Sequence, residues 1–125
     1  MIYTVTLNPA IDKTVTIPDF CLDSVNRVAD CRLDPGGKGI NVSKVLSALG
    51  QPSVVFTLLA GDTGRTLRAM LAQAGRSVVA HELPGQTRLN LKVVDPARHS
   101  NTDINEPGAP ASAAALAGLR QDLLA

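Results

Sequence analysis

A glycine-rich segment contains the residues of this chain that are best suited to bind a ligand. Its members are Gly36, Gly37, Lys38, Gly39 and Asn41, and a helix is predicted to begin within it. Glycine allows positive φ angles and a close approach between backbone and ligand. The start of a helix offers free N–H groups and a partial positive charge to anions. Lys38 adds a full charge, and the amide of Asn41 both donates and accepts hydrogen bonds, as sugar hydroxyls require.

The segment matches neither of two common nucleotide-binding motifs. Lys38 is followed by Gly39 rather than by Ser or Thr, so it does not form a Walker A loop. The G-x-G-x-x-G spacing of dinucleotide-binding proteins is absent as well. The residues alone leave a second interpretation open, a glycine turn before a helix with a solvent-exposed lysine.

Further polar residues could line the same site. Arg88, Asn90 and Lys92 alternate with apolar residues, which predicts a strand with one polar face that could contact a phosphate or polyol. Asp12 follows the first predicted strand, and ligand sites of open α/β sheets gather at the carboxyl ends of strands. Spacing alone also fits a solvated strand face and, for Asp12, a turn or capping residue. Arg27 carries little signal by itself.

The elements that would position these residues follow a β-α-β-α-β order, which predicts a parallel sheet with flanking helices. The predicted strands are 2–7, 53–59 and 77–80. The first helix has an apolar face made of Val42, Val45, Leu46 and Leu49. The second has an apolar face made of Leu67, Met70, Leu71 and Ala74.

Additional short strands interrupt this order. They are predicted at 13–20, 26–33, 87–94 and near Ile104. A last helix is predicted to begin near Ser112. Its inward-facing residues are predicted to be Leu116, Leu119 and Leu123.

Composition limits the class of protein. The chain has 125 residues, 45% of them hydrophobic and 18% charged, which favours a packed core over disorder. A net charge of +1 points to neither a nucleic-acid partner nor an acidic membrane surface. No apolar run approaches the roughly 20 residues of a membrane helix, and the start lacks signal-peptide features. Cys21 and Cys31 have no neighbours at metal-binding spacing, so we expect reduced thiols, no metal site and a cytoplasmic location.

Three segments, in this order, resemble the N-terminal half of the ribokinase-like (pfkB-type) carbohydrate kinases. They are Asn8-Pro9-Ala10-Ile11-Asp12, Gly36-Gly37-Lys38-Gly39-Ile40-Asn41-Val42-Ser43 and Thr87-Arg88-Leu89-Asn90. The resemblance runs from Met1 to about Gly108. Within the family it looks most like the branch of 1-phosphofructokinase and tagatose-6-phosphate kinase.

The resemblance implies a ribokinase-like α/β fold, of which residues 1–125 form the N-terminal part. A small β lid, with strands within about 13–34 and 87–105, would cover the sugar and form a homodimer contact. The implied substrate-binding residues are Asp12, Arg27, Gly36, Gly37, Lys38, Asn41, Arg88 and Asn90. Asp12 would accept hydrogen bonds from sugar hydroxyls, and the basic residues would meet the substrate phosphate.

The implied reaction transfers the γ-phosphoryl group of ATP, with Mg²⁺, to the C6 hydroxyl of fructose 1-phosphate. The family's Gly-Ala-Gly-Asp segment, which supplies the catalytic Asp, has no counterpart in this sequence. We therefore expect no catalytic residue, no cofactor site and no phosphoryl transfer by this chain alone. The alternatives are a non-catalytic sugar-phosphate-binding or dimerisation module, and specificity for tagatose 6-phosphate or fructose 6-phosphate.

Overall fold

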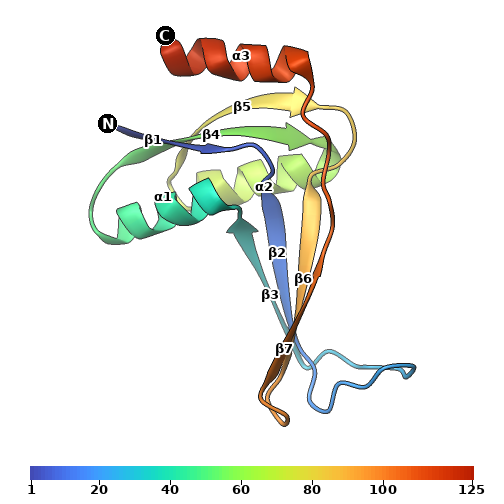
Figure 1. The fold of residues 1–125 in the computed structure, drawn as a ribbon. Coiled ribbons are helices and arrows are strands. Elements are labelled where there is room, and N and C mark those ends of the chain that lie inside the picture. Colours follow the sequence, from blue (N-terminus) through green and yellow to red (C-terminus); the bar gives the residue numbers. More distant parts are fainter.

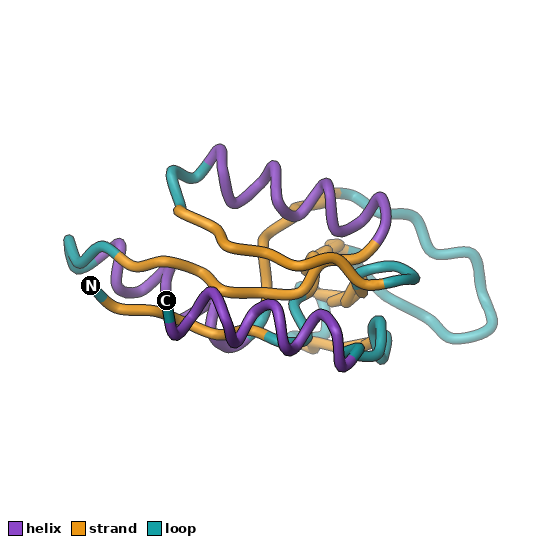
Figure 2. Tube along the Cα trace, turned by 90° about the horizontal axis from the view of Figure 1, so that it is seen from above, coloured by secondary structure: helices purple, strands orange, loops and turns teal.

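The computed structural model describes residues 1–125 as two sheets that meet at a narrow neck (Figure 1). The main sheet is parallel, in the order β1-β4-β5. Its strands are β1 (Ile2–Thr6), β4 (Ser53–Ala60) and β5 (Ser77–Leu83). Helices α1 (Lys38–Ala48) and α2 (Gly61–Gln73) cover one face, and α3 (Ala113–Leu124) covers the other. Seen from above, α3 runs along the direction of the strands beneath it (Figure 2).

The second sheet projects away from the main sheet as a long arm, hereafter the lid (Figure 1). Its strands, in spatial order, are β3 (Asp30–Gly36), β2 (Ala10–Thr16), β6 (Arg88–Asp95) and β7 (Ser100–Asn105). The central pair β2–β6 is parallel, and the two outer strands are antiparallel to their neighbours. The α/β class and the parallel main sheet expected from the sequence are confirmed.

The main core lies on both sides of β4. Between the sheet and helices α1 and α2, the buried residues are Ile11, Ile40, Val55, Leu59, Leu67 and Leu71. Between the sheet and α3, they are Phe56, Leu58, Ala60, Leu83, Ala115 and Leu119. Every residue from Val55 to Ala60 is buried, which confirms the prediction of a strand buried on both faces.

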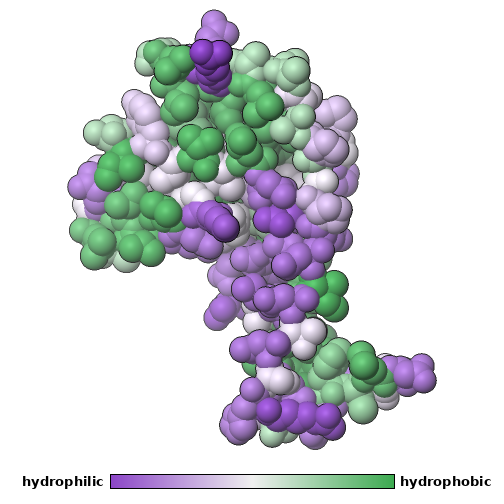
Figure 3. Space-filling view, in the orientation of Figure 1, coloured by the Kyte–Doolittle hydropathy of each residue, from purple (hydrophilic) through white to green (hydrophobic).

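The apolar face predicted for the first helix does not contact the sheet. Instead α1 buries Ile40 and Ser43, while Val42, Val45 and Leu49 are 51, 59 and 76% exposed. Helix α1 packs very closely on β1, since a Cβ atom on Gly39 would lie 2.6 Å from the carbonyl oxygen of Val5. A hydrogen bond of 2.8 Å joins the hydroxyls of Ser43 and Thr4. Apolar side chains over α1 therefore face solvent, at the left of Figure 3.

Helix α3 packs on β4 and β5 with a slightly different face from the predicted one. Leu119 is buried and Leu123 partly buried, but Leu116 is 37% exposed and Ala115 lies inside in its place. His81 on β5 also contacts α3, and its Nε2 lies 2.6 Å from Asp122 Oδ2. This polar contact joins β5 to the last turns of α3 beside the apolar contacts of Ala115 and Leu119.

Two lid strands occupy different ranges from those predicted. The strand expected at 13–20 is β2 at Ala10–Thr16, because Pro18 has no N–H to donate to a neighbouring strand. The strand expected at 26–33 is β3 at Asp30–Gly36. It continues through Pro35 because it lies at the edge of the sheet, where proline is tolerated.

None of the helices is both long and apolar enough to cross a lipid bilayer. Cys21 and Cys31 are free thiols exposed on the lid.

A buried carboxylate holds the far end of the lid together. Asp95, at the end of β6, is 2% exposed and accepts four backbone hydrogen bonds. The donors are the N–H groups of Asp19, Phe20, Ala97 and Arg98, at 2.9–3.2 Å. Burial raises the pKa of Asp95, but these donors outweigh it, so the pKa lies below its ordinary value. The ionised carboxylate thus ties the chain that follows β2 to the turn between β6 and β7.

We predict that the lid loses stability in acid through Asp95. Because the folded pKa is lowered, the contribution is complete above about pH 4 and is lost as the pH falls further. Urea unfolding at several pH values should show this loss in the wild type and a much smaller one in Asp95→Asn. Asp103→Asn, an exposed carboxyl on β7, is the matched control and should behave like the wild type. Equal acid sensitivity in Asp95→Asn would contradict the prediction.

Candidate functional site

The glycine-rich segment lies where the main sheet, the lid and α1 meet. Gly36 ends β3, and Gly37 precedes α1 with φ 123° and ψ 148°, a conformation almost restricted to glycine. A Cβ atom on Gly37 would lie 2.6 Å from Thr6 Cγ2, and one on Gly39 would lie 2.6 Å from the carbonyl oxygen of Val5. The absence of these side chains lets the start of α1 rest directly on the end of β1.

Asp12 and Asn90 are neighbours on the lid face that meets this segment. Asp12 on β2 pairs with Asn90 on β6 and with Asp34 on β3, and paired residues point to the same side of a sheet. A Cβ atom on Gly36 would lie 2.7 Å from Asp12 Cγ, so the carboxyl group lies over this glycine. Carboxylate and amide are therefore presented together beside the start of α1.

A pocket of about 270 Å³ opens next to these residues. It is lined by Val5, Thr6, Leu7, Asn8, Lys38, Gly39 and Arg88. Lys38 is the first residue of α1, and Arg88 is the first residue of β6. Two cations and a helix start at one opening make it attractive to an anion.

Unpaired polar atoms gather around this pocket. Four buried side-chain nitrogen or oxygen atoms in the chain lack a hydrogen-bond partner. One is Nε of Arg76, and the other three are Thr6 Oγ1, Arg88 Nε and Asn90 Oδ1. Buried polar groups are nearly always paired, so this concentration is typical of a site completed by a ligand.

The structure places most of the expected site residues together. Asp12, Lys38, Arg88 and Asn90 surround the start of α1. Their companions from the glycine-rich segment are Gly36, Gly37 and Asn41; Asn41 is exposed in the first turn of α1, where its N–H donates to the Gly37 carbonyl at 2.8 Å.

In a single chain, Arg27 does not reach the pocket. It is exposed in the loop between β2 and β3, close to Ala29, whose N–H donates to the Thr16 carbonyl. Thr16 and Asp12 are four residues apart along β2, or about 13 Å. Arg27 therefore lies at the far end of the lid.

Thr6 and Asn8 line the pocket without having been singled out as site residues. A signal for Thr6 existed in the sequence, because Thr4 and Thr6 alternate with apolar residues. The structure buries both threonines. Asn8 belongs to the first of the three segments that carry the family resemblance, but its neighbours across the neck are distant in sequence, so spacing could not predict them.

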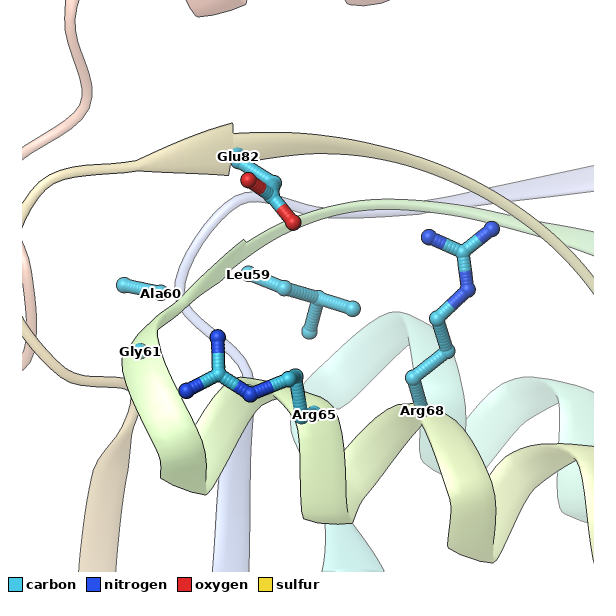
Figure 4. A pocket seen from close by; sticks show the side chains of 7 residues that line it. Leu59, Ala60, Gly61, Arg65, Arg68 and Glu82 are labelled. Carbon is cyan, nitrogen blue, oxygen red and sulfur yellow. The ribbon is translucent and has the colours of Figure 1, made fainter.

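A second pocket lies at the opposite edge of the main sheet, beside β5 (Figure 4). Its charged residues are Arg65 and Arg68 on α2 and Glu82 on β5. Arg65 is already paired with Asp62, and all of these side chains are exposed. None of the expected site residues lines it, so the pocket beside Lys38 and Arg88 is the candidate site.

Comparison with known proteins agrees with this architecture. Residues 5–124 match the model of the family described as "pfkB family carbohydrate kinase". The chain is 43% identical to a 1-phosphofructokinase of Rhodobacter capsulatus over 99% of its own length and 40% of that protein. It is 37% identical to a 1-phosphofructokinase of Bacillus subtilis over 86% of its length and 35% of that protein.

Solved structures show the same similarity. Phosphofructokinase-2 from Escherichia coli in complex with fructose-6-phosphate superposes with a TM-score of 0.93 at 30% identity. The match covers 98% of this chain and 41% of that one. The tetrameric inhibited form of the same enzyme gives a TM-score of 0.90, also at 30% identity.

The fold is thus part of the ribokinase-like α/β fold, with its lid. The match over residues 5–124 shows that this chain belongs to the pfkB family of carbohydrate kinases. It spans 33–40% of the length of the 1-phosphofructokinases it matches.

We predict that Gly37→Ala destabilises the chain more than Gly50→Ala. Both glycines have positive φ, which costs another residue about 1–3 kcal/mol. Only Gly37 is also crowded, whereas a Cβ atom on Gly50 would meet nothing within 4 Å. The clash should add about 1–3 kcal/mol in urea unfolding. Equal losses in the two variants would show that α1 does not need this close contact.

Proposed function

We propose that this chain forms the sugar-phosphate-binding part of a pfkB-type sugar kinase. The observation that carries the proposal is the pocket where Lys38 and Arg88 flank the start of α1, beside Asp12 and Asn90. A sugar phosphate needs charged donors for its phosphate and mixed donors and acceptors for its hydroxyls. Both kinds of partner occur side by side here.

The proposed roles follow from the chemistry of each side chain. Lys38 and Arg88 bind the phosphate, because charge-assisted hydrogen bonds to phosphate are strong and Arg can make two at once. Asp12 accepts hydrogen bonds from sugar hydroxyls, and Asn90 donates and accepts. Gly36 and Gly37 let the sugar approach the backbone, and Asn41 completes this wall from α1.

The family's reaction passes a γ-phosphoryl group from ATP, with Mg²⁺, to a sugar hydroxyl. Mg²⁺ in such enzymes is held by one or two carboxylates together with the nucleotide phosphates, and no three His, Cys, Asp or Glu side chains of this chain are grouped to hold an ion by themselves. The proposed contribution of the chain is therefore to bind and orient the acceptor sugar. We propose that it does not transfer phosphoryl groups alone.

Fructose 1-phosphate is the proposed substrate, phosphorylated at its C6 hydroxyl. The support is the similarity to 1-phosphofructokinases. The structural relative in complex with fructose-6-phosphate supports that sugar as the second candidate. Tagatose 6-phosphate is a third.

Calorimetric titration of the chain with fructose 1-phosphate tests the proposal. We expect saturable binding, weakened about tenfold to a hundredfold in Arg88→Ala, because a hydrogen bond to a charged group contributes about 1.5–3 kcal/mol. Asp12→Ala should weaken binding as well. Arg65→Ala removes an exposed arginine from α2, outside the pocket, and should bind like the wild type.

The outcomes separate the candidate functions. Binding of fructose 6-phosphate or tagatose 6-phosphate in preference to fructose 1-phosphate would reassign the substrate. No binding of any of them would overturn the proposed site and favour a dimerisation module. Phosphorylation of the sugar by the chain alone, with ATP and Mg²⁺, would refute the proposed lack of catalysis.

We also propose that the lid mediates a homodimer. Leu22 and Val25, in the loop between β2 and β3, are 86 and 80% exposed, and Val28, Leu33 and Ile104 are exposed on the same arm. Figure 3 shows apolar side chains at this end of the lid, at the lower right. Exposed apolar clusters of this kind are typical of protein interfaces.

Light scattering after size-exclusion chromatography tests the dimer. We expect a dimeric mass for the wild type and a monomeric mass for Leu22→Ser combined with Val25→Ser. Leu124→Ser is the matched control, since this leucine is also exposed but lies on α3, and it should leave the dimer intact. A monomeric wild type, or a dimer broken only by Leu124→Ser, would place the contact elsewhere.

A further inference from the structure

The chain crosses between the main sheet and the lid four times, and an asparagine on the first crossing contacts the last crossing and the residue that follows the third. Asn8 lies on the first, between β1 and β2. Arg88 begins β6 directly after the third, and Pro107 and Gly108 lie on the fourth, which connects β7 to α3. In Figure 1 this last connection runs along the neck from β7 up to α3. Residues 106–108 are called the strap below.

Asn8 binds the strap through its side chain. Its Nδ2 donates a hydrogen bond of 3.1 Å to the carbonyl oxygen of Pro107. Gly108, with φ 87°, leaves room for the amide, because a Cβ atom there would collide with Asn8 Oδ1. Glu106 adds a second anchor, since its Oε1 accepts a 2.8 Å hydrogen bond from the N–H of Leu89.

The same asparagine holds Arg88 through its backbone. Arg88 Nη2 donates a hydrogen bond of 3.1 Å to the carbonyl oxygen of Asn8. The Arg88 side chain also packs on the strap, because its Cδ would lie 3.4 Å from a Cβ atom on Gly108. Arg88 is thus confined between Asn8 and the strap, at the wall of the pocket that it shares with Lys38.

We propose that Asn8 is a positioning residue for Arg88. Its side chain fixes the strap, and the strap together with the Asn8 carbonyl holds the guanidinium group in place for an anion. Removing the amide frees the strap and, through it, Arg88. The inference rests on the proposed function only in that the bound anion is the phosphate of a sugar phosphate.

A double-mutant cycle on binding separates positioning from direct contact. We expect Asn8→Ala to weaken fructose 1-phosphate binding by about threefold to tenfold, the range for one hydrogen bond. In an Arg88→Ala background the same change should have no further effect, because its consequence passes through Arg88. Asn101→Ala, an exposed asparagine on β7 with no side-chain partner, is the matched control. An equal loss in both backgrounds, or no loss in either, would overturn the proposal.

A second measurement needs no ligand and so stands even if the chain does not bind sugar phosphates. We expect ¹⁵N relaxation of the Arg88 Nε–H group to show a rigid side chain in the wild type and a mobile one in Asn8→Ala. The same signal of Arg65 should not change. Asn8→Asp keeps the shape of the side chain but not its donor, so it gives the same test should Asn8→Ala fail to fold. An Arg88 signal that stays equally rigid in the variant would refute the positioning role.

Discussion

The close contact between the first turn of α1 and the end of β1 is the constraint on which the site depends. Gly37 and Gly39 permit it, because a side chain at either position would strike β1. The contact sets the helix start, and with it Lys38, at the carboxyl end of β1. With α1 packed in this way, Val42 and Val45 face solvent. The same helix packing thus accompanies both the binding site and an exposed apolar surface.

Much of the architecture could be predicted because it is encoded locally. The alternation of polar and apolar residues predicted the polar face of β6, and a continuous apolar run predicted the buried strand β4. The rotation of α1 could not be predicted, since a 3.6-residue pattern shows which residues share a face but not what lies beside it. The backbone contact at Gly39 decides that, and it joins elements distant in the sequence.

The site was predictable in part for the same reason. Asp12 and the glycine-rich segment carry signals in their own neighbourhoods. That Asp12 lies beside Asn90 depends on the parallel pairing of β2 with β6, two strands that are far apart along the chain. The residues that contact Asn8 are equally distant from it along the chain. The separation of Arg27 from the pocket likewise depends on how the lid strands are arranged. Such relations arise from topology, which residue spacing does not contain.

Strand β6 is held by hydrogen bonds at both ends, so it connects the neck to the tip of the lid as one element. Asp95 binds four backbone donors at the tip, while Arg88 is held at the neck. From Arg88 to Asp95 the strand spans about 23 Å, so a rotation of about 10° at the neck would displace the tip by about 4 Å. Any rotation at the anion site would therefore move the apolar end of the arm further than the site itself.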